Sequence, residues 1–330
     1  MRRVKGADQR ITVRVLPVLV LTALAVAPGA TQSGSSAPST AFRAITVETV
    51  AVPLNPHDPS ASTIGDFQYA GGFAFRTRDT NMLHELSDLV ITGADHLVAI
   101  GDEGVLFEAR LLFDEAGRLA GLTDARIARL PGENGRSLGG EDADAEGLTL
   151  LPNGDRLVSF ERHPRIWLYP RTGARPRAVP SPRTMFRANA GMEALAADPD
   201  AGADAYVVGV EDSGATWTCR MTTSCVQGPT VEKPVEFGLV SMTRLPDRMT
   251  AYLLRAYDGV RGVRVVLTIN RASTVISRLE MAPPLTVDNF EGVTSLAGTT
   301  GQRRFYLMSD DNNDASQRTL LLAFDWKPAK

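Results

Sequence analysis

The chain alternates short apolar runs with polar turns, and five stretches of it repeat one arrangement. In each stretch an acidic or glycine-led segment opens an apolar run, a turn follows, and a second apolar run ends on a charged residue. The five stretches are 85–102, 146–161, 193–211, 238–255 and 291–310. Self-similarity at a regular interval is the mark of a repeat architecture, so the repeat predicts the fold before any single residue does.

The clearest copy predicts a β-hairpin. Residues 146–151 form one expected strand, 152–155 the turn and 157–160 the returning strand. Asn153-Gly154 between two apolar runs is a strong hairpin signal, because both residues tolerate positive φ. In an antiparallel hairpin the start of one strand lies beside the end of its partner. Each hairpin is therefore expected to deliver two polar groups to one rim of the fold.

The spacing of the closing charges favours an all-β fold, a β-propeller. These charges recur at intervals of 44 to 59 residues and are Asp102, Glu161, Glu211, Arg255 and Asp310. Propeller blades repeat at about 40–50 residues, and more with loop insertions. We expect six blades, the sixth closed by an early strand near 73–75 and a terminal strand over 319–324. A β-sandwich is the alternative, but hairpins paired within units suit blades better than Greek keys.

The N-terminal segment has the pattern of a targeting sequence. Five basic residues precede a thirteen-residue apolar stretch, 15–27, and small residues follow up to Ala30. This pattern predicts a signal peptide over 1–30, since the stretch is shorter than the roughly 20 residues of a spanning helix. A disordered linker is expected over 31–43 and the propeller domain over 44–330. The protein is thus expected to be exported, periplasmic or extracellular, without a stable membrane anchor.

Charge narrows the range of partners. Removing residues 1–30 takes away five positive charges and one negative charge, which shifts the formal net charge from −3 to −7. No basic face for nucleic acid is expected, and an acidic rim suits a cation. We expect a monomer. We also expect a small anionic substrate, which Arg255, the one basic residue among the closing charges, would bind.

The two cysteines, Cys219 and Cys225, are six residues apart. In an exported protein, two nearby cysteines most often form a disulfide. Two free thiols fit poorly outside the cytoplasm, and a metal pair is weaker still because no histidine lies near in the sequence. The bond is expected to staple a loop after the third copy of the repeat.

The available chemistry is dominated by carboxylates and amides. The chain has no Gly-x-Ser-x-Gly elbow, no phosphate-binding Gly-Lys-Ser/Thr loop and no His-Glu-x-x-His motif. Its four histidines are few for zinc, which favours nitrogen and sulfur ligands. Oxygen ligands suit Ca²⁺, with Mg²⁺ as the alternative.

The hairpin pattern places a set of acidic and amide residues at one rim, where they predict a metal or substrate site. The candidate metal ligands are Asp144, Glu146, Glu193, Glu211, Asp288, Glu291, Asp310, Asp311 and Asn312. Crowded carboxylates repel one another and raise each other's pKa unless a cation neutralises them. The alternative is that these are turn and strand-end residues chosen for backbone reasons.

Three further residues at the rim are candidates for catalysis. Glu161 and His163 could transfer a proton, although His163 also fits an exposed loop histidine. Arg255 interrupts the acidic series, either as a structural counter-charge or as a clamp for an anionic group.

Three segments resemble a known family. They are Asp144-Ala145-Glu146-Gly147-Leu148 through Glu161, Asn189 to Leu195, and Asp288 to Gly292 through Ser309-Asp310-Asp311-Asn312-Asn313 to Leu322. Together they resemble the phytase-like family described as "esterase-like activity of phytase". The resemblance implies an exported bacterial propeller that hydrolyses ester or phosphoester bonds. The first copy departs from it, with His84-Glu85-Leu86-Ser87-Asp88 where a glycine-rich segment is expected.

Two functions remain open at this point. The first is a metal-assisted hydrolase, in which a Ca²⁺-type ion at the rim activates water. The second is a non-catalytic propeller that binds a ligand or partner and uses its ions for structure, since a propeller fold alone does not choose a function. A lactonase acting on sugar acids ranks below both.

Overall fold

The computed structural model describes residues 41–187, 189–298 and 301–327. The expected signal peptide and most of the expected linker lie outside these residues. Within the described part there are 23 β-strands and one short 3₁₀ turn, η1 (Gly140–Asp142), and no α-helix. None of the described residues forms a helix long and apolar enough to cross a membrane. The expected all-β fold is therefore confirmed.

The strands group into antiparallel units of four. Three units are separate sheets, which we call blades 2, 3 and 4. Blade 2 consists of β9 (Ala145–Leu150), β10 (Arg156–Phe160), β11 (Arg165–Tyr169) and β12 (Arg177–Val179). Blade 3 consists of β13 (Ala194–Ala197), β14 (Ala205–Gly209), β15 (Thr216–Arg220) and β16 (Cys225–Gln227), and blade 4 consists of β17 (Gly238–Leu245), β18 (Met249–Asp258), β19 (Gly262–Arg271) and β20 (Thr274–Met281).

Two more units lie in one larger sheet. Blade 1 consists of β5 (Leu86–Thr92), β6 (His96–Gly101), β7 (Val105–Phe113) and β8 (Leu119–Arg129). Blade 5 consists of β21 (Asn289–Ala297), β22 (Arg303–Asp310), β23 (Leu320–Trp326) and the early strand β4 (Phe67–Arg76). A single parallel bridge between Gly71 and Leu119 joins the two blades. The short strands β1 (Arg43–Ala44), β2 (Glu48–Ala51) and β3 (Thr63–Ile64) pair with β8, β4 and β4.

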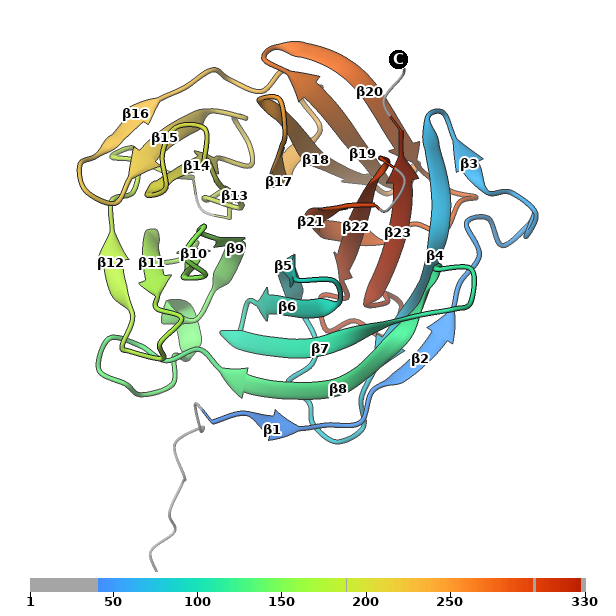
Figure 1. Cartoon of the computed structure of the whole chain (residues 1–330), viewed down its shortest axis with the longest axis horizontal. Helices are drawn as coiled ribbons and strands as arrows, with labels where there is room; N and C mark the ends of the chain where they lie inside the picture. Colours follow the sequence, from blue (N-terminus) through green and yellow to red (C-terminus); the bar gives the residue numbers. More distant parts are fainter. Residues whose placement is uncertain (1–40, 188, 299–300, 328–330) are drawn as a thin grey trace, which may run out of the picture. The chain divides into compact units, whose positions relative to one another are not determined.

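The five blades stand in a ring around a central axis (Figure 1). The first strand of each blade is the innermost, and each contacts the first strands of the two neighbouring blades, in the order β5, β9, β13, β17, β21 and back to β5. This closed circuit of inner strands is the arrangement of a β-propeller.

The sixth blade expected from the sequence does not form in the described residues. The two strands expected to build it, β4 and β23, pair with each other, and β23 also pairs with β22. They therefore complete blade 5, which takes its outermost strand from the start of the chain. Joining both ends of the chain within one blade closes the ring, as expected, but at five units.

Hairpin turns join the first two strands of blades 2 and 4, as the repeat predicts. In blade 2, Gly154 has a φ of 85° and the Leu151 N–H donates to the Asp155 carbonyl at 2.9 Å. In blade 4 the turn residues Asp247 and Arg248 both have positive φ, 58° and 57°. Turns with positive φ match the twist of the strands that they join, which explains why these short loops fix the register.

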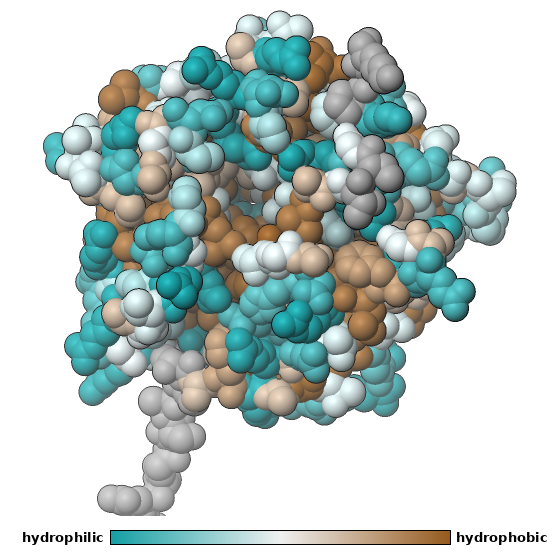
Figure 2. All heavy atoms as spheres, viewed as in Figure 1, coloured by the Kyte–Doolittle hydropathy of each residue, from teal (hydrophilic) through white to brown (hydrophobic). Residues whose placement is uncertain are grey.

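The core lies between the faces of adjacent blades. Leu, Val and Ala line it, and its largest fully buried side chains include several phenylalanines, such as Phe73, Phe107 and Phe160. Apolar side chains also surround the central hollow (Figure 2). The predicted disulfide is confirmed: Cys219 on β15 and Cys225 on β16 are bonded and lie directly opposite each other. It closes the turn between β15 and β16 of blade 3, after the third copy of the repeat, as expected.

Candidate functional site

One rim of the ring collects the start of each inner strand and the end of its partner. Asn289 pairs with Asp310 in blade 5, Gly238 with Arg255 in blade 4, and Leu86 with Gly101, next to Asp102, in blade 1. The register confirms the prediction that each hairpin brings two polar positions to one edge. The polar groups that close the five repeats therefore meet at a common opening.

A repeated β-bulge turns acidic side chains of the inner strands toward this opening. Four of the five inner hairpins shift register at the second or third residue of the inner strand, and the shift falls at Ser87, Glu146, Val240 and Glu291. A bulge adds an unpaired residue and re-aims its side chain. In blade 2 and blade 5 that residue is a glutamate, and in blade 3 Glu193 directly precedes the inner strand β13.

The carboxylates at the opening are close enough to perturb one another. Burial raises the pKa of Asp102 to about 8, with Asp310 and Asp144 adding to the effect. Burial likewise raises the pKa of Asp310 to about 8, and the charge of Glu291 raises it further. The pKa of Glu146 is raised well above its ordinary value by burial, and then by Asp102 and other carboxylates of the rim. Carboxyl groups are thus crowded where water is partly excluded, which favours their protonated forms when no cation is bound.

Arg255 is the cation within this acidic ring. Its Nη1 donates to Glu291 Oε1 and, at 2.6 Å, to Asn289 Oδ1, while its Nη2 lies 3.5 Å from Glu211 Oε1. Burial acts against the charged guanidinium, but the carboxylates, Glu291 foremost, outweigh it and raise the pKa of Arg255. Arg255 therefore remains charged and offsets part of the negative charge on the blade 4 and blade 5 side.

A three-carboxylate cluster lies on the opposite side, between blades 1 and 2. Asp102, Asp144 and Glu146 each offer an oxygen within 4.8 Å of the others. Carboxylate oxygens at this spacing suit a hard divalent cation. A second group, His84, Glu85 and Glu103, has ligand atoms within the same distance.

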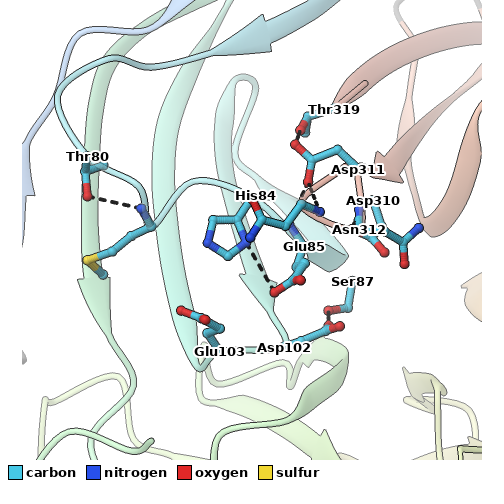
Figure 3. A network of polar contacts seen from close by, with 12 residues as sticks. Thr80, His84, Glu85, Ser87, Asp102, Glu103, Asp310, Asp311, Asn312 and Thr319 are labelled. Atoms are coloured by element: carbon cyan, nitrogen blue, oxygen red, sulfur yellow. Dashed lines mark hydrogen bonds and ion pairs between the residues drawn. The ribbon is translucent and has the colours of Figure 1, made fainter. Parts of the chain in front are cut away.

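A network of polar contacts lies at the rim where the segment before β5 meets the loop after β22 (Figure 3). The Glu85 N–H donates to Asp311 Oδ1 at 3.0 Å, and the Ser87 hydroxyl donates to Asp102 Oδ1 at 2.6 Å. Thr319 donates to the other oxygen of Asp311 at 2.8 Å. Both oxygens of Asp311 are therefore used in bonds within the protein.

Several predicted ligands also have internal partners. Asp288 accepts a bond from Arg318 Nε at 3.1 Å. The Asn312 N–H donates to Asp310 Oδ1 at 2.7 Å, and its side-chain amide donates to Gln317 at 2.9 Å. These contacts brace the loop after β22 and fit the alternative interpretation of turn and strand-end residues.

The two predicted proton-transfer residues lie in different surroundings. Glu161 is half-buried at the opening, accepts a bond from the Gly191 N–H at 3.1 Å, and has a pKa raised by burial. His163 is exposed and contacts Asp142 at 2.8 Å and Glu141 at 3.8 Å, both on or beside the η1 turn. The structure thus places Glu161 with the ring and His163 toward its outer edge.

The candidate set from the sequence left out two residues that the structure brings to the rim. Asp102 closes the first repeat, yet only its place across from blade 2 shows that it joins Asp144 and Glu146. Asn289 donates to Glu291 Oε1 at 2.9 Å and to Asp310 Oδ2 at 3.2 Å, and so links two carboxylates. The repeat marked Asp102, and Asn289 lies within the segment 288–292 that the sequence singled out, but its role as a link between two carboxylates was not predicted.

A cavity of about 890 Å³ opens beside the ring, lined by residues that include Glu211, Arg255, Tyr257, Asp288 and Arg318. Strand β18 forms one wall because it runs on to Asp258, three residues beyond Arg255, while β22 ends at its rim residue Asp310. The projecting hairpin carries Tyr257, whose side chain is largely exposed, over the cavity. The cavity thus combines an aromatic wall with charged groups.

The profile of one family matches most of this chain, residues 81–313, and the family is described as phytase-like, esterase-like activity of phytase. The chain belongs to this phytase-like family. A search of curated protein sequences gave no match.

Solved structures resemble this phytase-like chain only distantly. Virginiamycin B lyase from Staphylococcus aureus is 9% identical, with a TM-score of 0.44, over 87% of this chain and 100% of that one. A protein provisionally assigned as a gluconolactonase is 10% identical, with a TM-score of 0.46, over 90% and 95%. A member of the DUF4221 family from Bacteroides vulgatus is 9% identical, with a TM-score of 0.40, over 88% and 100%.

Proposed function

We propose that this protein is an exported, metal-assisted hydrolase of ester or phosphoester substrates, with its active site at the acidic opening of the propeller. The observation that supports the proposal most is that charged side chains from all five blades meet at one opening. Each of the five blades contributes a charged side chain to one opening: Asp102, Glu146, Glu193, Arg255 and Glu291. Such a concentration of buried carboxylates is costly in itself, which makes it a candidate functional site.

The residues present fit a divalent cation. Asp102, Asp144 and Glu146 would hold it, because they offer three carboxylate oxygens within 4.8 Å of one another and no nitrogen or sulfur donor. Such a set suits Ca²⁺, or Mg²⁺ as the alternative. When bound, the ion would supply Lewis-acid chemistry, polarising the scissile group and making water easier to deprotonate.

Side chains at the opening would transfer the proton of the reaction and bind the anionic group of the substrate. Glu161 is the better candidate base of the two predicted from the sequence, because it lies in the ring and its pKa is raised by burial. Asp310, whose pKa is raised by burial and by the charge of Glu291, is the candidate to donate a proton to a leaving group. Arg255 and the half-exposed Arg318, both at the cavity, would orient an anionic substrate.

Turnover of p-nitrophenyl acetate and p-nitrophenyl phosphate, measured with Ca²⁺ and with chelator, tests the proposal. We expect activity on at least one substrate that chelator abolishes, and a loss of at least tenfold in kcat/KM for Glu146→Gln, as for other groups that hold a catalytic metal. Glu108→Gln is the matched control, because it removes a buried carboxylate that pairs with Arg126 and Arg156. Activity that survives both chelator and Glu146→Gln rules out the metal mechanism.

A second function, a ligand-binding propeller with a structural ion, is favoured by one specific observation. Arg255, Asp288 and Asp311 already bond to groups of the protein itself. A melting temperature that falls with chelator, without turnover on any ester or phosphoester, would support this alternative over the hydrolase.

The remaining aspects of the proposal concern location and assembly. The disulfide of blade 3 supports export, because such bonds persist in oxidising compartments. We propose a periplasmic or extracellular monomer, which size-exclusion chromatography with light scattering and cell fractionation would test.

A further inference from the structure

One buried acid lies one layer below the rim. Asp88, on the inner strand β5, is 1% exposed. At the same register the inner strands of the other four blades carry small residues, namely Gly147, Ala194, Ser241 and Gly292. Asp88 is the only one of these five residues with an ionisable side chain, and it belongs to none of the groups assigned above.

The Asp88 carboxylate bonds to three different blades. Its Oδ2 accepts the Leu148 N–H of blade 2 at 2.8 Å. Its Oδ1 accepts the Ser241 hydroxyl of blade 4 at 3.0 Å and the Leu89 N–H of its own blade at 2.9 Å. Ser241 Oγ in turn accepts the Val293 N–H of blade 5 at 3.2 Å. One side chain thus connects blades 1, 2, 4 and 5.

These bonds satisfy inward-facing N–H groups of the inner strands that have no partner within their own sheets. The inner strand of each blade is a sheet edge, and its inward N–H groups have no strand partner. A buried N–H without an acceptor is costly, so nearly all are satisfied in folded proteins. Asp88 supplies the acceptor for Leu148 directly and for Val293 through Ser241.

Blade 5 leaves room for the Asp88 side chain because residue 292 is a glycine. A Cβ added at Gly292 would lie 2.7 Å from Leu89 Cδ2, 3.0 Å from Asp88 Cα and 3.2 Å from Asp88 Oδ1. Gly292 therefore has to lack a side chain for Asp88 to occupy this position. The layer that Asp88 fills separates the acidic opening from a lower cavity of about 230 Å³, which the next residues of the inner strands line.

The two amides that Asp88 fixes are each two residues from a glutamate of the ring. Leu148 follows Glu146, and Val293 follows Glu291, across the bulge in each strand. We propose that Asp88 is a positioning residue that holds the bulged segments of blades 2 and 5, and so places Glu146 and Glu291 at the opening. This inference rests on the proposed metal site, for which Glu146 is a candidate ligand.

The chemistry of the site distinguishes a carboxylate from its amide. All three direct partners of Asp88 are donors, and they use both of its oxygens. In Asp88→Asn the side-chain NH₂ must therefore face either the Leu148 N–H or the donors on the other side. One amide loses its acceptor in either orientation, although the shape is unchanged.

Calcium binding and amide hydrogen exchange test the proposal together. The proteins are the wild type, Asp88→Asn, Asp88→Gly with and without added formate, and Asp198→Asn. The last is the control, since Asp198 is a buried carboxylate that pairs with Arg244, and Arg244 lines the lower cavity on the other side of the Asp88 layer. Calorimetry gives the Kd for Ca²⁺, and amide exchange is followed at Leu89, Leu148 and Val293.

We expect Asp88→Asn to weaken Ca²⁺ binding by 10- to 100-fold, the range seen when a group that orients a metal ligand is removed. The amide that faces the new NH₂, either Leu148 or Leu89, should exchange faster in Asp88→Asn. Asp198→Asn should keep its Ca²⁺ affinity within about twofold of the wild type. Formate should restore both Ca²⁺ affinity and slow exchange in Asp88→Gly, because it returns a carboxylate to the vacated space.

Three results would overturn the proposal. They are an unchanged Kd in Asp88→Asn, equal losses in Asp88→Asn and Asp198→Asn, and fast exchange of the Leu148 amide in the wild type. The last measurement needs no variant, so it decides even if the substitutions prevent folding. If the wild type binds no Ca²⁺ but protects the Leu148 amide from exchange, the proposed metal site is refuted. The hydrogen bond by which Asp88 fixes blade 2 is then still supported.

Discussion

The metal-free protein should lose stability as the pH rises from 5 to 7. Burial and mutual repulsion raise the pKa of both Asp102 and Asp310 from an ordinary 3.8 to about 8 in the folded state. A carboxyl with a raised folded pKa binds its proton more tightly in the folded protein. Its stabilising contribution is complete below the unfolded pKa and is lost as the pH rises toward the folded value.

The size of the effect follows from the two shifts. Between pH 5 and pH 7 each group lies above its unfolded pKa and below its folded pKa, so each contributes about 1.36 kcal/mol per pH unit. Two groups over two units give an upper limit of about 5 kcal/mol. Asp102 and Asp310 interact and the opening admits water, so we expect about half of this, roughly 2–3 kcal/mol.

Urea unfolding at pH 5, 6 and 7, in chelator and in Ca²⁺, measures the effect. Stability should fall with pH in chelator and change much less in Ca²⁺, because the cation replaces the protons. The double variant Asp102→Asn/Asp310→Asn should show a flatter dependence than the wild type. Constant or rising stability of the chelator-treated wild type over this range would refute the account of the ring.

Three further predictions concern other parts of the molecule. Replacing the disulfide of blade 3 by two serines should lower the free energy of unfolding by about 2 kcal/mol and leave Ca²⁺ affinity unchanged; a loss of affinity would show that blade 3 shapes the rim. Gly292→Ala should lower the free energy of unfolding by about 2–3 kcal/mol, because the new Cβ meets the inner strand of blade 1. Gly259→Ala, with open space around it, should leave the free energy of unfolding unchanged in the same urea assay. Tyr257→Ala should raise KM for p-nitrophenyl phosphate about fivefold without changing kcat, from the loss of about 1 kcal/mol of aromatic contact; an equal effect on an alkyl phosphate would exclude a stacking role.

Much of the fold could be predicted from the sequence because hairpins are local. The alternation of apolar and polar residues and the Asn153-Gly154 turn lie within one short segment, and the structure has that hairpin. Counting outward from the expected turn puts Glu291 opposite Asp310, whereas the structure pairs Asp310 with Asn289, two residues away across the bulge at Glu291. The existence of an acidic rim could therefore be predicted without any coordinates.

The number of blades could not be predicted in this way. Strands β4 and β23 lie near opposite ends of the chain, and the sequence is equally consistent with a separate sixth blade and with the outer half of the fifth. Their pairing with each other and with β22 decides for the second. Long-range pairing depends on how neighbouring sheets pack, which no local pattern records.

The residues alone determined that five hairpins would bring acidic groups and one arginine to a shared edge, because strand period and turn chemistry are set by neighbours in the chain. Only the tertiary structure decided which of these groups are neighbours: Asp102 beside Glu146, Arg255 against Glu291, and Asp88 on the axis between blades. The physical reason is that contacts between blades depend on ring closure and on bulges that shift the register, and both are settled by packing and by the need to satisfy buried N–H groups.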